Sequence, residues 1–178
     1  MSEDTWLAAR LIPTSGINGA EEQERRATSA LLARVGDDDP TVRRAAVAAL
    51  GEIGDPRAAG RLVEILGDPG LQSAAAEALR RTGLLALPEL ERGFAGSGPE
   101  ARRLIVNLTG KLEDRRARRL LLSALADDSA SVRTEAALAL GDGGFLEAVR
   151  PLMDLKASDP SPLARQAAAV ALRKLAPR

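Results

Sequence analysis

The chain has 178 residues, of which 45% are apolar and 2% aromatic, which is enough apolar material for a core built mainly from Ala and Leu. It contains no Cys, which excludes disulfides, thiolate metal sites and cysteine nucleophiles, and no His, which excludes His-dependent metalloenzymes and Ser-His-Asp hydrolases. Its 25 basic and 25 acidic residues cancel, so the chain as a whole has no electrostatic attraction to nucleic acid.

The first 18 residues stand outside the pattern that organises the rest of the chain. Trp6, Leu7 and Leu11 fall on one face of a short predicted helix, which the Pro-Thr-Ser-Gly segment 13–16 would end. The favoured interpretation is a capping helix over residues 1–18, because the end of a repeat array needs a cover. The alternative is an arm that docks a partner with Trp6 as its anchor, since Trp is common at binding hot spots.

The N-terminal segment also bears on location. It reads MSEDTWLAARLIPTSG, without a basic leader or a long apolar core, which argues against a signal peptide. No stretch of the chain approaches the roughly 20 apolar residues that a membrane span requires. We therefore expect a cytoplasmic protein.

From residue 19 to residue 178 the sequence is a degraded repeat. The opening of the segment DPTVRRAAVAALGEIGDPRAAGRLVEIL (39–66) returns along the chain, and alignment on Pro40 places Pro69, Pro99, Ala130 and Pro162 in one column. The steps between these positions are 29, 30, 31 and 32 residues. A period near 30 residues with two helices in each unit is typical of an α-solenoid rather than of a single-core fold.

The unit 39–66 shows why each repeat is a helix pair. Asp39 is a predicted N-cap, and Pro40 follows at the first helical position, where its missing N–H costs nothing. An apolar stripe follows at helical spacing: Val42, Ala45, Ala46, Ala49, Leu50 and Ile53. After Gly54, a second helix carries the apolar residues Ala58, Ala59, Leu62, Val63, Ile65 and Leu66. A pair this short cannot bury both of its faces alone, so neighbouring pairs must stack.

This motif resembles the HEAT repeat, in particular the short HEAT-like repeats first known from phycobilisome lyases, over residues 20–178. The resemblance implies an all-α superhelix, an α-solenoid in which the outer helix of each pair precedes the inner one. Five pairs fit this order: 20–35 with 40–53, 56–66 with 69–82, 85–94 with 98–111, 114–126 with 130–142, and 145–157 with 161–175. Pro88 and Pro151 fall inside outer helices, where such repeats often carry a kinking proline.

The resemblance also implies a ladder of Asp–Arg pairs that ties neighbouring inner helices together. The residues in its positions are Asp39, Arg43, Arg102, Arg133 and Arg165. The second repeat departs from this pattern, because Gln72 stands in the Arg position and the segment TGLLALPELERGF lacks the Gly-Asp-Pro of the first repeat. We therefore expect the ladder to break or bend at the second repeat.

Charge is distributed unevenly along the chain, which indicates where a partner binds. Residues 1–79 hold 8 Arg against 13 Asp and Glu, whereas residues 80–119 hold 10 basic residues against 5 acidic ones. Inner-helix positions that face or flank the groove give the candidate binding residues Arg44, Glu77, Arg80, Arg81, Arg103, Asn107 and Lys111. Because solenoids bind partners on their concave surface, we expect a scaffold or adaptor that binds an acidic protein surface or segment.

Two alternatives concern these basic residues. They are either an ordinary solvated face or, in the Arg-rich middle repeats, contacts to nucleic-acid phosphates. The run Arg115, Arg116, Arg118 and Arg119 would supply such contacts. The absence of Tyr and the presence of only three widely spaced rings argue against stacking on single-stranded bases.

A catalytic role is a further alternative, since chromophore lyases and some DNA glycosylases are built on related repeats. A pocket for a large conjugated ligand needs aromatic side chains that this chain lacks. Glu77, next to Arg80 and Arg81, is the nearest approach to a catalytic acid, and at this spacing it is typical of a helix-surface ion pair. We therefore expect no enzyme activity, no catalytic residue, no cofactor and no metal.

The last inner helix leaves two interpretations open. Leu163 and Val170 have no following pair to cover them, which favours end-to-end pairing of two copies or a partner at this end. Alternatively, polar residues make the helix its own cap: Arg165, Gln166, Arg173 and Lys174.

Overall fold

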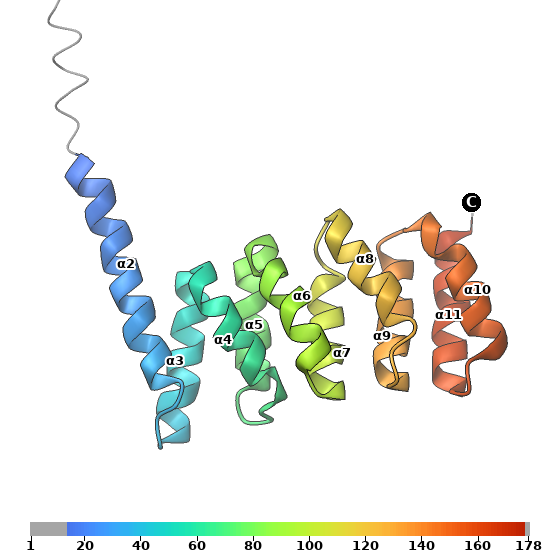
Figure 1. The fold of residues 1–178 in the computed structure, drawn as a ribbon, viewed down its shortest axis with the longest axis horizontal. Coiled ribbons are helices and arrows are strands. Elements are labelled where there is room, and N and C mark those ends of the chain that lie inside the picture. The colour runs from blue at the N-terminus through green and yellow to red at the C-terminus, as the bar shows by residue number, and fades with distance from the viewer. Residues whose placement is uncertain (1–13, 177–178) are drawn as a thin grey trace, which may run out of the picture.

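The computed structural model describes residues 14–176, and side chains from residue 19 onward. Within this range the chain forms five helix pairs stacked in a row (Figure 1). The pairs are α2 (Thr14–Arg34) with α3 (Pro40–Ile53), α4 (Ala59–Glu64) with α5 (Gln72–Thr82), α6 (Leu87–Gly96) with α7 (Pro99–Thr109), α8 (Arg115–Ala124) with α9 (Ala130–Asp142), and α10 (Val149–Ser158) with α11 (Pro162–Leu175). The described part of the chain is thus the predicted all-α solenoid, and none of its helices could cross a membrane.

Short polar side chains begin the helices as the sequence predicts. The carboxylates of Asp39, Asp55 and Asp114 accept backbone N–H groups two residues further on, at 2.6–2.9 Å. Asp55 also accepts the Thr28 hydroxyl of α2 at 2.7 Å, so the first outer helix is fastened to the turn after α3. The guanidinium of Arg57 holds the pKa of Asp55 at about 2, which keeps this buried carboxylate ionised.

Two predicted boundaries were wrong. α2 already begins at Thr14, so no turn over 13–16 separates it from the preceding residues; residues 1–13 lie outside the described part of the chain. α5 begins at Gln72 instead of Pro69, because the Asp68 carboxylate accepts the N–H of Gly70 and holds residues 68–71 in a turn.

Outer helices begin with a tight 3₁₀ turn in three of the pairs: η1 (Pro56–Ala58), η3 (Gly83–Ala86) and η4 (Leu146–Ala148). A second tight turn, η2 (Ile65–Gly67), follows α4. Pro88 and Pro151 lie in the first turn of α6 and of α10, directly after η3 and η4. A proline at the start of a helix lacks an N–H that would be unpaired there, so both are accommodated without breaking the helix.

Apolar side chains of both helix rows meet in a continuous core. All six apolar residues predicted for the second helix of the first unit are buried: Ala58, Ala59, Leu62, Val63, Ile65 and Leu66. The stripe predicted on α3 is rotated, because Ala45 is exposed whereas Val47 and Gly51 are buried. The physical reason is the close approach of α5 to α3 at Gly51.

Three of the four contacts between successive inner helices share one feature, here named the Gly–Ala seam: Gly51 on Ala78, Gly110 on Ala139, and Gly141 on Ala171. A Cβ added at any of these glycines would lie 2.6–2.8 Å from an atom of the facing alanine. Only glycine therefore allows the helices to pack so closely.

The seam is missing between α5 and α7. By the same spacing from the Arg position of each repeat, the facing residues there are Arg80 and Leu108. Two large side chains stand where the other junctions have a glycine and an alanine.

Candidate functional site

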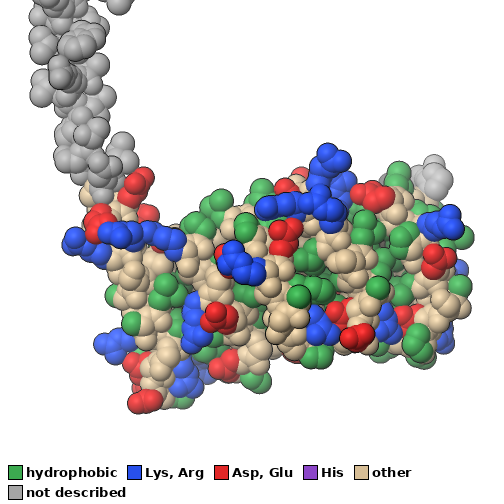
Figure 2. Space-filling view, in the orientation of Figure 1, with side chains coloured by type: hydrophobic (Ala, Val, Ile, Leu, Met, Phe, Trp, Pro, Cys, Tyr) green, Lys and Arg blue, Asp and Glu red, His purple; other side chains and the backbone are tan. Residues whose placement is uncertain are grey.

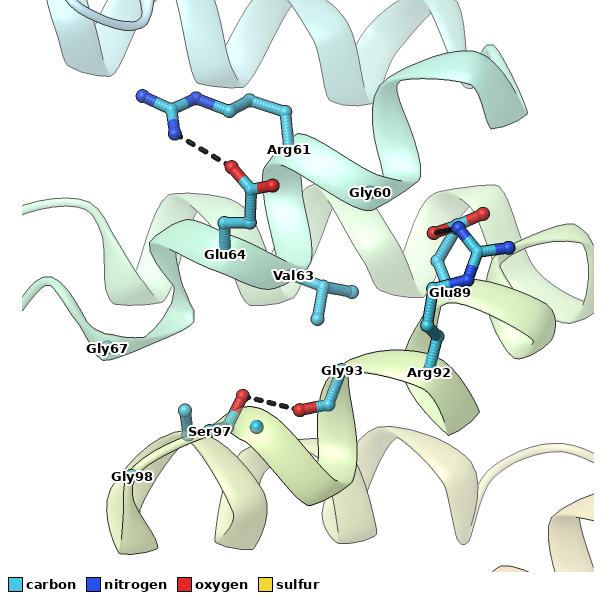
Figure 3. Close-up of a pocket in the computed structure, with 12 residues that line it drawn as sticks. Gly60, Arg61, Val63, Glu64, Gly67, Glu89, Arg92, Gly93, Ser97 and Gly98 are labelled. Carbon is cyan, nitrogen blue, oxygen red and sulfur yellow. Dashed lines mark hydrogen bonds and ion pairs between the residues drawn. The ribbon is translucent and has the colours of Figure 1, made fainter.

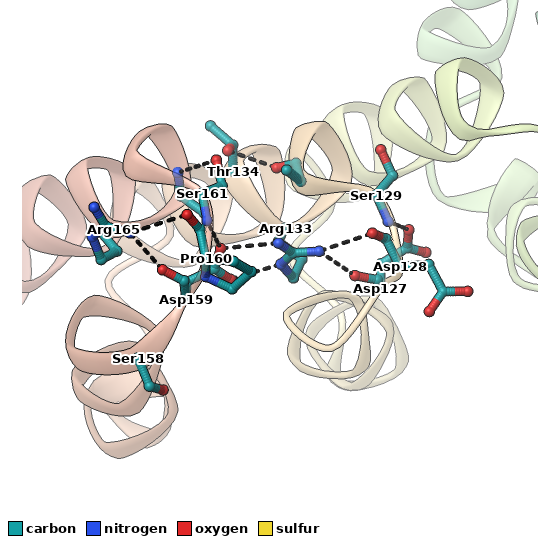
Figure 4. Close-up of polar contacts among 12 residues, drawn as sticks. Asp127, Asp128, Ser129, Arg133, Thr134, Ser158, Asp159, Pro160, Ser161 and Arg165 are labelled. Carbon is teal, nitrogen blue, oxygen red and sulfur yellow. Dashed lines mark hydrogen bonds and ion pairs between the residues drawn. The ribbon is translucent and has the colours of Figure 1, made fainter.

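The Asp–Arg ladder connects the last three helix pairs (Figure 4). Arg102 binds both carboxylate oxygens of Asp127 at 2.8 Å, and Arg133 binds those of Asp159 at 2.7 and 2.9 Å. Arg133 also donates to the carbonyl oxygens of Asp127 and Asp128, which ties its own turn to the next one. The hydrogen bond from Arg133 lowers the pKa of Asp159, so this largely buried pair stays ionised.

The ladder takes a different form in the first two pairs. Asp39 was expected in the ladder, but its carboxylate caps α3, and the ladder carboxylates Asp127 and Asp159 align with Asp37 instead. Arg43 donates to the backbone carbonyls of Asp37 and Asp38. Arg165 likewise donates to the carbonyls of Asp159 and Pro160.

The junction of the second and third pairs has no ladder contact among the described residues. Gln72 reaches only the carbonyl oxygen of Leu66 in its own turn, at 3.2 Å. In the next repeat Arg102 donates to the carbonyl of Ser97 at 2.9 Å, at a position where the later repeats carry an aspartate. The junction thus lacks both the ladder and the Gly–Ala seam.

A cleft opens at this junction, between α5 and α7 with α6 as its floor. Its volume is about 440 Å³, and its lining residues are Leu79, Arg80, Gly83, Leu90, Leu108, Lys111 and Leu112. Four of them are leucines, and the two charged ones are both basic. This lining defines the α5–α7 cleft, which is the candidate functional site.

Exposed apolar residues continue the cleft surface. Gly83 ends α5 with φ of 63°, a left-handed conformation that favours glycine and turns the chain into η3. Leu84 and Leu85 follow directly and are 51% and 64% exposed, although they are large apolar residues. Leucines this exposed beside an apolar cleft favour an interaction surface.

The predicted groove residues divide into two groups. Arg80 and Arg81 on α5 share Glu77, at 2.6 and 3.4 Å, while Lys111 at the end of α7 has no ion pair among the described residues. Basic charge therefore exceeds acidic charge at the cleft. Arg80 lowers the pKa of Glu77, which keeps that carboxylate charged.

The second group is neutralised within the protein. Arg103 lies between Glu100 at 2.7 Å and Glu135 at 3.5 Å, and Asn107 donates to Glu135 at 2.7 Å. Glu135 belongs to α9 and was not among the predicted groove residues. Arg44 is exposed on α3, away from the cleft.

A second hollow of about 590 Å³ lies at the same junction on the outer row, between α4 and α6 (Figure 3). Its charged side chains pair within their own helices, Arg61 with Glu64 at 2.8 Å and Arg92 with Glu89 at 2.7 Å. A Cβ at Gly93 would collide with Val63 at 2.3 Å, so glycine allows α6 to approach α4. With its charges satisfied internally, this hollow offers less to a partner than the α5–α7 cleft.

The basic run at the start of α8 forms a patch on the upper edge of the face in Figure 2. Arg118 pairs with Glu147 at 3.1 Å and lies 5.3 Å above the centre of the Phe145 ring. Arg116 lies 4.0 Å from Glu91, while Arg115 and Arg119 are exposed. Four arginines in the first turns of a helix oppose its dipole, so this patch has a local energetic cost.

The remaining candidate surfaces are the two ends. Trp6 lies outside the described residues. At the other end, Leu163 is 68% exposed and Val170 partly buried. Among the described residues no three acidic side chains converge as a metal site.

Two solved structures have a similar fold. Human deoxyhypusine hydroxylase in complex with glycerol matches 85% of this chain and 74% of its own, with 24% identity and a TM-score of 0.54. The complex of CpcE and CpcF of phycocyanin lyase from Nostoc sp. PCC7120 matches 82% of this chain and 98% of the other, with 23% identity and a TM-score of 0.58.

Both names are those of enzymes. The prediction that the chain is not an enzyme was therefore wrong, because it treated the repeat architecture as pointing away from catalysis, and this architecture serves both enzymes.

Sequence comparison with curated proteins finds no match. The profile of the HEAT-repeat family, in contrast, matches residues 6–80 and 87–173, which together make up most of the chain. This match confirms the resemblance read from the Asp-Pro…Val-Arg motif. The chain belongs to the HEAT-repeat family.

Proposed function

We propose that the chain binds an acidic polypeptide segment of another protein at the α5–α7 cleft. The observation that carries this proposal is the lining of the cleft, whose only charged members are Arg80 and Lys111. An acidic segment crossing the cleft would meet basic groups on both walls, one from α5 and one from α7. Such complementarity favours an anionic partner and speeds its association.

Rigid elements hold the basic groups in place. Glu77 accepts from both Arg80 and Arg81 and restrains their side chains, so less side-chain entropy is lost when a carboxylate of the partner binds. The ammonium of Lys111 is exposed and has no ionic partner among residues 19–176. Arg103 and Asn107 lie further along α7 and offer polar contacts, and Arg44 on α3 lies at the far end of the groove.

Charge reversal at the cleft tests this proposal. The test variant carries Arg80→Glu, Arg81→Glu and Lys111→Glu. The control variant carries Arg150→Glu, Arg173→Glu and Lys156→Glu, which reverses the same residue types at exposed positions of α10 and α11. Both variants have the same net charge, so only the location of the change differs.

Binding is measured by fluorescence anisotropy with two labelled probes, a short Glu-rich peptide with one central Phe and a DNA duplex. Circular dichroism establishes that both variants fold. We expect wild type and control to bind the peptide alike and the cleft variant to bind it at least about tenfold more weakly. Equal loss in both variants would reduce the effect to net charge. Salt-dependent binding of the DNA without binding of the peptide would replace the proposal with nucleic-acid binding through the Arg-rich middle repeats.

A further inference from the structure

We infer that the α5–α7 cleft is a pocket for one large apolar side chain of the acidic segment, flanked by its carboxylates. This inference rests on the proposed function and adds to it the anchor that determines which acidic segments bind. It starts from the junction itself. Where the other inner helices meet through a glycine and an alanine, α5 and α7 meet through Arg80 and Leu108.

The floor of the cleft is apolar and already formed. Leu79, Leu90 and Leu108 come from three different helices and are almost fully buried, so they are held by the core. No rearrangement is needed to present an apolar surface to a ligand. A volume of about 440 Å³ lies in the range of small-ligand pockets, which accommodates an aromatic or large aliphatic side chain.

The mouth of the cleft favours the same occupant. Leu84 and Leu85 extend the apolar surface beyond Gly83 into solvent. Arg80 and Lys111 stand at the walls with no acidic residue in the lining. An apolar side chain between carboxylates matches this arrangement of leucines and basic groups, whereas a uniformly acidic or uniformly apolar segment matches only half of it.

Matched peptides separate this inference from the proposed function. The probes are the labelled Glu-rich peptide with a central Phe and the same peptide with Ser in place of Phe. Burying the ring should strengthen binding to the wild-type chain by about tenfold or more. The Ser peptide retains the charge-dependent part of binding.

A pair of variants locates the effect. Leu112→Asp places a carboxylate in the lining of the cleft, while Leu146→Asp makes the same change at an exposed position of η4, far from the cleft. We expect Leu112→Asp to abolish the preference for Phe and Leu146→Asp to retain it. A milder pair, Leu84→Ser with Leu85→Ser, should reduce the preference without touching buried residues.

The outcomes are distinct. If wild type binds the Phe and Ser peptides equally, the apolar anchor is refuted while charge-dependent binding stands. If neither peptide binds, the proposed function fails and the anchor with it. If the preference for Phe persists in Leu112→Asp and in the Leu84→Ser, Leu85→Ser variant, the ring binds elsewhere and the assignment of the cleft is overturned.

Discussion

The Gly–Ala seam predicts that Gly141 cannot be enlarged without moving a helix. In Gly141→Ala the new Cβ would lie 2.6 Å from the Cα and 2.7 Å from the Cβ of Ala171, whereas carbon atoms in contact are normally about 3.5–4 Å apart. α11 would have to move away from α9 by about 1 Å. Overpacking of this kind costs about 1–3 kcal/mol, and the better helix propensity of Ala returns about 1 kcal/mol. We expect a net loss of about 1–2 kcal/mol in the free energy of unfolding.

The same substitution at an open position is the control. Gly19 lies inside α2, and a Cβ there would meet no atom within 4 Å. Gly19→Ala should therefore be neutral or stabilise the protein by up to about 1 kcal/mol. Urea unfolding followed by circular dichroism compares the two variants with wild type.

A double variant tests the contact itself. Combining Gly141→Ala with Ala171→Gly exchanges the two side chains across the seam and removes the collision. The double variant should lose less stability than the sum of its single variants, because the two positions are in contact. A urea midpoint for Gly141→Ala at or above that of wild type would refute the argument that the seam sets the spacing of the inner helices.

Three further predictions concern single groups. Asp159→Ala should cost about 3 kcal/mol, because it leaves Arg133 largely buried without its carboxylate; a urea midpoint unchanged from wild type would contradict the ladder. The pKa of Asp55 falls from 3.8 to about 2 on folding, so its contribution of about 2 kcal/mol is complete above the unfolded pKa and lost as the pH falls towards 2; unfolding measured across this range should show the loss in wild type and not in Asp55→Asn. Gly83→Ala should lower the melting temperature, because φ of 63° strains any other residue by about 1–3 kcal/mol, whereas Gly36→Ala, with open space and no positive φ, should not.

Much of the architecture could be predicted from the sequence. The α9 boundaries agree with the predicted range 130–142, and the α3 boundaries with 40–53. Local chemistry explains this success, since an N-cap such as Asp39, a following proline and a glycine such as Gly54 act within a few residues of themselves. Where a boundary was missed, as at Asp68–Leu71, a local hydrogen bond to Gly70 competed with the helix.

The site was only partly predictable. Arg80 and Lys111 were identified by helical spacing, but the leucines of the cleft were not, because an apolar residue at such a position normally belongs to the core. The helical face of Arg103 was also predicted, yet its charge is compensated by Glu135 of the next pair. One signal was available: Arg80 occupies the position at which the other repeats carry Gly51, Gly110 and Gly141.

The sequence by itself determined that this chain is a stack of about five helix pairs, because period, caps and apolar stripes are written within each unit of about 30 residues. Only the tertiary structure decided where the stack opens. The distance between two inner helices depends on residues about 30 positions apart that meet across a junction, a glycine with an alanine in one place and Arg80 with Leu108 in another. Packing across junctions, which no single repeat encodes, is therefore what forms the α5–α7 cleft.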